Sequence, residues 1–145
     1  MRKRTKRKVW PLINTVAHVI EGVSEVPEAM LESLRARELA AIDAIHRGAA
    51  GEFDWHDINA MVGVCLVMAQ EGVGPEAIEV CGHAKQSLQE DWAKYAETGR
   101  METTEAGLKN YRDVYEYTDL QRTSISREQY EKHIALSIKK VRFQK

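Results

Sequence analysis

The sequence has few of the residues that interrupt helices. Only three prolines occur among 145 residues, and no stretch of useful length alternates apolar and polar residues as a half-buried strand does. Pro27 and Pro75 both suit the first position of a helix, where proline is tolerated, and each is followed by a glutamate. The scarcity of breaks therefore predicts an all-α protein.

Cysteine and long apolar runs are also scarce. The two cysteines, Cys65 and Cys81, fall inside apolar helical patterns, which favours reduced thiols over a disulfide framework. The sequence contains no signal peptide pattern and no apolar run of about 18 residues, the length that a membrane-spanning helix needs. We therefore expect a soluble cytoplasmic protein without membrane contact, large enough to form one core without a disulfide or a metal.

Helix start and stop signals divide most of the chain into helical segments. Besides the two prolines, the expected starts are Asp54, Thr103 or Thr104, and Ser126, which forms a capping box with Gln129. Glycines at 48, 72 and 99 follow three of the segments. The expected helices cover residues 28–47, 55–71, 76–97, 105–122 and 127–141, with a short sixth helix near 12–21.

The apolar residues indicate how these helices pack. Residues 60–69 are apolar on nearly all sides, so that helix is expected at the centre, and short connections favour antiparallel neighbours. The sequence predicts a single-domain antiparallel bundle of five to six helices, for which two stacked helical hairpins are one arrangement. We expect a disordered basic arm at residues 1–9, the bundle at 10–140 and a basic tail at 141–145.

The net charge is small, but the charged residues are unevenly placed. The net charge is −1, yet residues 9–136 hold 22 acidic and 11 basic side chains, and both ends are basic. Cations at the ends would contact nucleic acid through phosphates, in a salt-dependent and sequence-independent manner. The predicted nucleic-acid-binding residues are Arg2, Lys3, Arg4, Lys6, Arg7, Lys8, Lys139, Lys140 and Arg142.

Two interpretations remain open for each charged region. The arm is either such an anchor or a solubilising tail, including part of an import signal. The acidic body is either a set of solvated helix faces or a surface that competes for a nucleic-acid-binding site on a host protein.

Patterns of catalytic or metal-binding residues are lacking. In the segment FDWHD, Asp54, His56 and Asp57 are spaced so that they do not share one helix face, and helix capping and packing account for them. The histidines are scattered one per segment, and the glycines of EGVGPEA lack the Lys-Ser/Thr ending of a phosphate-binding loop. We expect no enzyme activity, no cofactor and no metal site.

One carboxylate lies where a hydrophobic residue is expected. Glu38 falls near the middle of the apolar stripe of residues 28–47, and a buried carboxylate must be paired. Arg122 lies on the apolar face of residues 105–122 and is the first candidate partner, with Arg112 as the second. We predict a structural ion pair between Glu38 and Arg122.

Several aromatic and apolar residues have both a packing and a binding interpretation. Tyr111 and Tyr115 lie four residues apart on the apolar face and are expected to pack, whereas Tyr117 points away and is free for a partner. Leu39 and Val114 lie outside the apolar stripes. They indicate a homodimer contact, unless further helices pack on that side.

Three segments carry a resemblance to a group of known proteins: RKRTKRKVWPLIN, then LRARELAAIDAIHRGAAGEFDWHDINAMVGVCLVMAQEGVGPEA, then ETGRMETTEAGLKNYRDVYEYTDLQRTSISREQYE. Their order resembles that of small proteins encoded in phages and prophages of proteobacteria, over nearly the whole chain. Some of these proteins carry automatic labels as Fis-type transcriptional regulators, which implies a helix-turn-helix near the C-terminus. The resemblance also implies a protein that binds and redirects host machinery.

Together these observations give a leading and an alternative function. We expect a phage accessory protein that binds a host protein or nucleoprotein complex stoichiometrically, while its basic ends contact nucleic acid. The alternative is a DNA-binding regulator of phage genes, with the final helix in the major groove and the arm in the minor groove or along the backbone.

Overall fold

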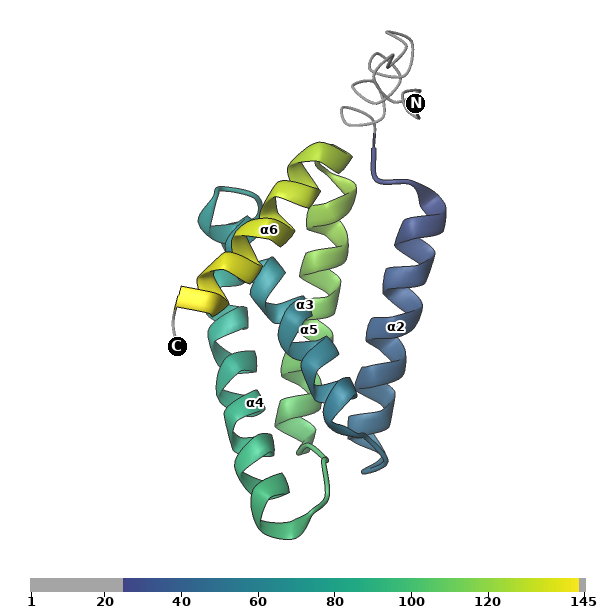
Figure 1. Ribbon diagram of the computed structural model, residues 1–145, viewed down its shortest axis with the longest axis vertical. Helices are drawn as coiled ribbons and strands as arrows, with labels where there is room; N and C mark the ends of the chain where they lie inside the picture. Colours follow the sequence, from purple (N-terminus) through teal and green to yellow (C-terminus); the bar gives the residue numbers. More distant parts are fainter. Residues whose placement is uncertain (1–24, 144–145) are drawn as a thin grey trace, which may run out of the picture.

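The computed structural model describes residues 25–143, with side chains as far as Lys140 (Figure 1). This part of the chain forms five helices and two isolated β-bridges, and the prediction of an all-α single-domain bundle is confirmed. The basic arm and the short helix expected near 12–21 lie outside the described residues. The helices are α2 (Glu28–His46), α3 (Glu52–Gln70), α4 (Ala77–Thr98), α5 (Glu105–Thr123) and α6 (Arg127–Phe143).

The structure confirms the predicted helix ends at three places. Thr104 caps α5, because its hydroxyl accepts a hydrogen bond from the Gly107 amide at 3.0 Å. Ser126 and Gln129 form the expected capping box ahead of α6, with both hydrogen bonds at 3.2 Å. Gly99 ends α4 in the left-handed conformation, with a φ of 77°, which glycine adopts without strain.

The predicted starts of three helices were displaced by one to three residues. Asp54 does not cap α3: the helix begins at Glu52, and the Asp54 carboxylate accepts a hydrogen bond from the Gly51 amide at 2.8 Å. Pro27 is the residue before α2, and Pro75 lies two residues before α4. The α6 helix runs to Phe143, two residues beyond its expected end at 141 and three beyond the expected boundary of the bundle at 140.

The helices alternate in direction, and α3 occupies the centre of the bundle. In Figure 1, α2 and α4 run downward, α3 and α5 run upward, and α6 crosses the upper part of the molecule at an angle. Two antiparallel hairpins, α2–α3 and α4–α5, pack on each other, and α3 contacts each of the other four described helices. The apolar character of residues 60–69 predicted this central place.

The interior contains two separate hydrophobic clusters. The main core is formed by α2, α3, α4 and α5 together with the connection before α5, and it includes the fully buried Ile45, Ile58 and Tyr111. A smaller cluster joins α6 to the rest of the molecule, through Tyr130 of α6 and Met68 of α3. Thus α2 to α5 share one large core, whereas α6 rests on a small one.

The prediction that Val114 is exposed was wrong. Its side chain is completely buried in the main core, because α5 packs against α2, α3 and α4 and therefore buries a wider face than one stripe. Leu39 is 46% exposed on α2, as its position outside the stripe indicated. None of the helices between residues 25 and 143 combines the length and apolarity needed to cross a membrane.

Candidate functional site

Glu38 and Arg122 form the predicted ion pair across α2 and α5. The two nitrogens Nη1 and Nη2 of Arg122 donate to the two carboxylate oxygens of Glu38, at 3.0 and 2.9 Å. The Arg122 side chain is fully buried, and that of Glu38 is 9% exposed. Arg112, the second candidate, is exposed on α5. Parallel hydrogen bonds of this kind are the strongest geometry for a buried pair.

A second carboxylate extends the pair into a network. The Asp119 carboxylate accepts hydrogen bonds from Nε of Arg35 at 2.8 Å and from Nε of Arg122 at 3.1 Å. Burial raises the pKa of Glu38, and the hydrogen bonds from Arg122 offset part of that effect. Burial would also raise the pKa of Asp119, but the hydrogen bonds from Arg35 and Arg122 lower it overall. Every charge has an opposite partner, which indicates a structural link between α2 and α5.

A second buried polar link joins α4 to α5 and was not predicted. The Tyr111 hydroxyl donates a hydrogen bond to the Asp91 carboxylate, and both residues are buried. Burial raises the pKa of Asp91 and that of the Tyr111 phenol. A usable sequence signal existed, since Asp91 continues the stripe of Ala84 and Leu88 at helical spacing, just as Glu38 lies in the stripe of α2.

The residues of FDWHD take part in an aromatic cluster between α3 and α4. The rings of Trp55 and Trp92 lie 4.8 Å apart between centroids, and those of Trp92 and Tyr95 lie 5.6 Å apart. The Trp55 indole donates to the Leu88 carbonyl at 3.0 Å, and the Tyr95 hydroxyl donates to the Glu52 carboxylate at 2.8 Å. Trp55 therefore packs as predicted. Within residues 25–143, no group of three or more acidic, histidine or cysteine side chains could hold a metal ion.

The cysteines and the remaining tyrosine candidate belong to the core. Cys65 and Cys81 are free thiols, both fully buried. The hydrogen bond with Cys81, together with burial, raises the pKa of the Cys65 thiol, which makes it a poor nucleophile. Tyr117, which was predicted to be free for a partner, is half-buried against the main core.

The predicted nucleic-acid-binding residues fall into two groups. The six of the arm, and the side chain of Arg142, lie outside the described residues. Lys139 and Lys140 are exposed on α6, and the Lys140 ammonium donates to the Gln70 side chain at 2.7 Å. The described chain begins at Glu25, which forms a β-bridge with Ser126 just before α6.

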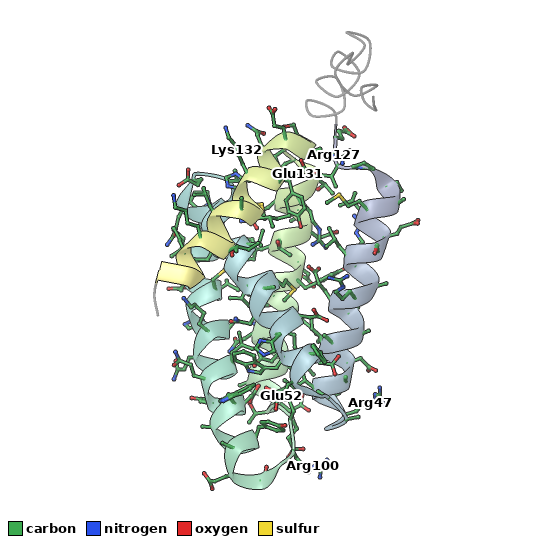
Figure 2. All side chains as sticks on the ribbon, in the orientation of Figure 1. Arg47, Glu52, Arg100, Arg127, Glu131 and Lys132 are labelled. Atoms are coloured by element: carbon green, nitrogen blue, oxygen red, sulfur yellow. The ribbon has the colours of Figure 1, made fainter. Side chains whose placement is uncertain are left out.

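Acidic and basic residues are segregated between α6 and the other helices. Residues 25–126 carry 19 acidic and 9 basic side chains, whereas residues 127–143 carry 2 acidic and 5 basic ones. Figure 2 shows Arg127, Glu131 and Lys132 on the first half of α6, at the end of the molecule opposite Glu52 and Arg100. Among the five described helices, α6 alone has more cations than carboxylates.

No protein-family model, curated protein or solved structure matches the chain. The resemblance to small phage and prophage proteins therefore stays a prediction. Function has to be argued from the geometry and charge of the described residues.

Proposed function

We propose that the chain is a phage or prophage accessory protein that binds a host protein or nucleoprotein complex stoichiometrically, with its basic ends contacting nearby nucleic acid. The observation that carries this proposal is the segregation of charge, with a basic α6 on an acidic body. The β-bridge between Glu25 and Ser126 supports it, because it brings the beginning of the described chain next to the start of that same helix.

This charge layout fixes how the protein would approach a polyanion. A duplex attracts α6 and the arm, and it repels the acidic faces of α2, α3 and α4. Those acidic faces would then point away from the nucleic acid. Such a molecule needs no catalytic group to change the activity of a nucleoprotein complex.

A DNA-binding regulator is the second candidate, and one observation favours it. Residues 124–126 join α5 to α6, and three residues is the length of a helix-turn-helix connection. A recognition helix, however, contacts bases through its N-terminal residues. In α6 the first two turns carry the exposed Glu128 and Glu131, while Lys139 and Lys140 lie near the C-terminal end of the helix. This order favours contact with phosphates over readout of bases.

The test compares charge-matched variants of the full chain for binding to a mixed-sequence duplex over a range of salt concentrations. One variant replaces the six cations of the arm by glutamine, and another is Lys139→Glu with Lys140→Glu. The matched control is Lys85→Glu with Lys94→Glu, which changes two exposed cations of α4 by the same charge. We expect the wild type to lose about 0.9 units of log affinity per tenfold rise in salt for each phosphate contacted, and the first two variants to have smaller slopes.

The control variant should keep the slope of the wild type. Absence of duplex binding by the wild type near physiological salt, or an equal loss in the control, would contradict the nucleic-acid part of the proposal. A sequence-selective footprint would favour the regulator instead. Recovery of one host protein at unit stoichiometry after nuclease treatment would support the accessory role, and failure to recover any would count against it.

A further inference from the structure

An open groove of about 570 Å³ lies between α6 and the end of α3. One wall is formed by Glu71 and Val73, which follow α3, and the other by the outer flank of α6. Lys132, Leu136 and Lys139 belong to that flank. The groove therefore lies on the basic helix, and the proposal below rests on the function proposed above.

The groove has an apolar floor and a cationic rim. Val73 and Leu136 supply the apolar surface, and Leu136 is 36% exposed although it is a large hydrophobic residue. Lys132 and Lys139 are seven residues apart, which places their ammonium groups on the same edge of α6, two turns apart. An apolar centre with a charged rim is the arrangement of protein-binding surfaces.

His133 adds an unsatisfied polar group to the same groove. The residue is 9% exposed, lines the groove, and its Nδ1 atom has no hydrogen-bond partner among the described residues. Buried polar groups are nearly always paired, and an unpaired one costs free energy. Because His133 lines the groove, a segment bound there would change the surroundings of its imidazole ring.

We propose that the groove binds an acidic, amphipathic segment of the protein partner. An apolar side chain of that segment would cover Val73 and Leu136, and its carboxylates would meet Lys132 and Lys139. A nucleic acid fits less well, because a phosphate backbone offers no apolar side chain for the floor.

The experiment measures the fluorescence anisotropy of a labelled synthetic peptide built from glutamate and leucine at helical spacing, titrated with the full chain. The key variant is Leu136→Ser, and the matched control is Ile138→Ser, which alters an apolar residue of α6 that is 57% exposed and does not line the groove. We expect Leu136→Ser and Lys132→Glu each to weaken binding by about tenfold or more, and the control to bind within about twofold of the wild type.

Two competitors identify what the groove recognises. Polyglutamate without leucine should displace the peptide poorly, and a mixed-sequence duplex should displace it poorly at a salt concentration where the lysines are screened. In addition, the imidazole nitrogen signals of His133 should shift in NMR spectra when the peptide binds. That shift would not occur if the peptide only gathered around exposed lysines.

The proposal is overturned if the wild type does not bind the peptide, if Ile138→Ser weakens binding as much as Leu136→Ser, or if polyglutamate competes equally well. It is also overturned if Leu136→Ser weakens duplex binding and leaves peptide binding intact, since the groove would then belong to nucleic acid. Failure of the proposed function has a different signature. In that case no variant of the arm, Lys139 or Lys140 changes duplex binding, while the dependence of peptide binding on Leu136 remains.

Discussion

The four helices α2 to α5 differ from the last helix, α6, in the buried contacts that hold them in the bundle. The first four share the main hydrophobic core, and two buried polar links tie α5 to its neighbours, through Glu38 with Arg122 and through Asp91 with Tyr111. By contrast, α6 packs mainly against α3, over a small hydrophobic cluster that includes Tyr130 and Met68. Regions with fewer buried contacts open at lower free energy, and binding surfaces are often drawn from them.

The contrast extends to charge. The four-helix body is acidic and internally paired at Glu38, Arg122, Asp119 and Arg35, whereas α6 presents Lys139 and Lys140 toward solvent. The body therefore holds the larger share of the buried contacts, and α6 exposes Leu136, Ile138, Lys139 and Lys140 to solvent. Substitutions in the two regions should therefore differ in how much they lower the free energy of unfolding, and in whether they affect the whole bundle or α6 alone.

The largest effect is expected at the buried ion pair of the body. Arg122→Ala leaves the Glu38 carboxylate without its partner in the interior, so the free energy of unfolding should fall by about 3–5 kcal/mol. Urea unfolding followed by circular dichroism measures this. Arg112→Ala, an exposed change on the same helix, should stay within about 0.5 kcal/mol of the wild type.

A double substitution tests whether the loss comes from the unpaired charge. Glu38→Leu combined with Arg122→Met removes both charges and should recover most of the stability that Arg122→Ala loses. If Arg122→Ala costs no more than Arg112→Ala, the pair does not stabilise the body, and the contrast with α6 loses its main support.

The next effect concerns the link between α4 and α5. Tyr111→Phe removes the hydroxyl that donates to Asp91 and leaves a buried carboxylate with less hydrogen bonding, which should cost about 1–3 kcal/mol in urea unfolding. Tyr117→Phe, on the same helix but half-buried, serves as the control and should change little. A loss of equal size in the two variants would show that the hydrogen bond from Tyr111 to Asp91 adds nothing beyond the general effect of removing a hydroxyl from α5.

A substitution between α3 and α6 should act locally. A Cβ atom at Gly63 would lie 2.9 Å from the hydroxyl oxygen of Ser137, so the absence of a side chain there lets α6 approach α3 closely. Gly63→Leu should therefore displace α6 at a cost of about 1–3 kcal/mol. Amide hydrogen exchange should show lost protection in α6 with protection in α4 retained.

Gly82→Leu is the matched control for that prediction. Gly82 lies on α4, where a Cβ would meet no atom within 4 Å, so the same substitution adds a better helix former without a clash. Equal loss of protection in α6 and in α2 to α5 after Gly63→Leu would mean that the bundle unfolds as one unit, and that α6 is not a separately attached element.

The features that the sequence predicted correctly are those that depend on spacing along a single helix. Helix ends and the pair of Glu38 and Arg122 follow from local spacing, because capping residues and a carboxylate within an apolar stripe are visible along one helix. The same rule would have identified Asp91 in the stripe of α4. That link between Asp91 and Tyr111 was not predicted.

Other features depend on which helices meet, and spacing along one helix does not contain that information. Val114 lies outside the apolar stripe of α5 and is nevertheless buried, because α5 has neighbours on more than one side. The groove beside α6 arises where the segment after α3 passes Lys132 and Leu136, more than fifty residues away in sequence. The charge of α6 was visible in the sequence, but its place on the outside of an acidic bundle was not.

The smallest expected effect is the contribution of His133 in α6 to the pH dependence of stability. Burial lowers the pKa of His133 below its ordinary value of 6.5, an effect that Glu71 opposes and Lys132 reinforces. Below about pH 6.5 the unfolded chain therefore binds more protons at this site than the folded protein does. The stability that neutral His133 contributes is fully present above that pH. It is lost as the pH falls from 6.5 toward the pKa of His133 in the folded protein.

The measurement is the free energy of unfolding by urea on both sides of this pH window. It compares the wild type with His133→Gln and with His56→Gln, which alters an exposed histidine of the body. The His133→Gln profile should be flatter than that of the wild type, and the His56→Gln profile should be parallel to it. Parallel profiles for all three proteins would show that the interior beneath α6 accepts a charged imidazole, and that α6 is attached less tightly than its contacts with α3 indicate.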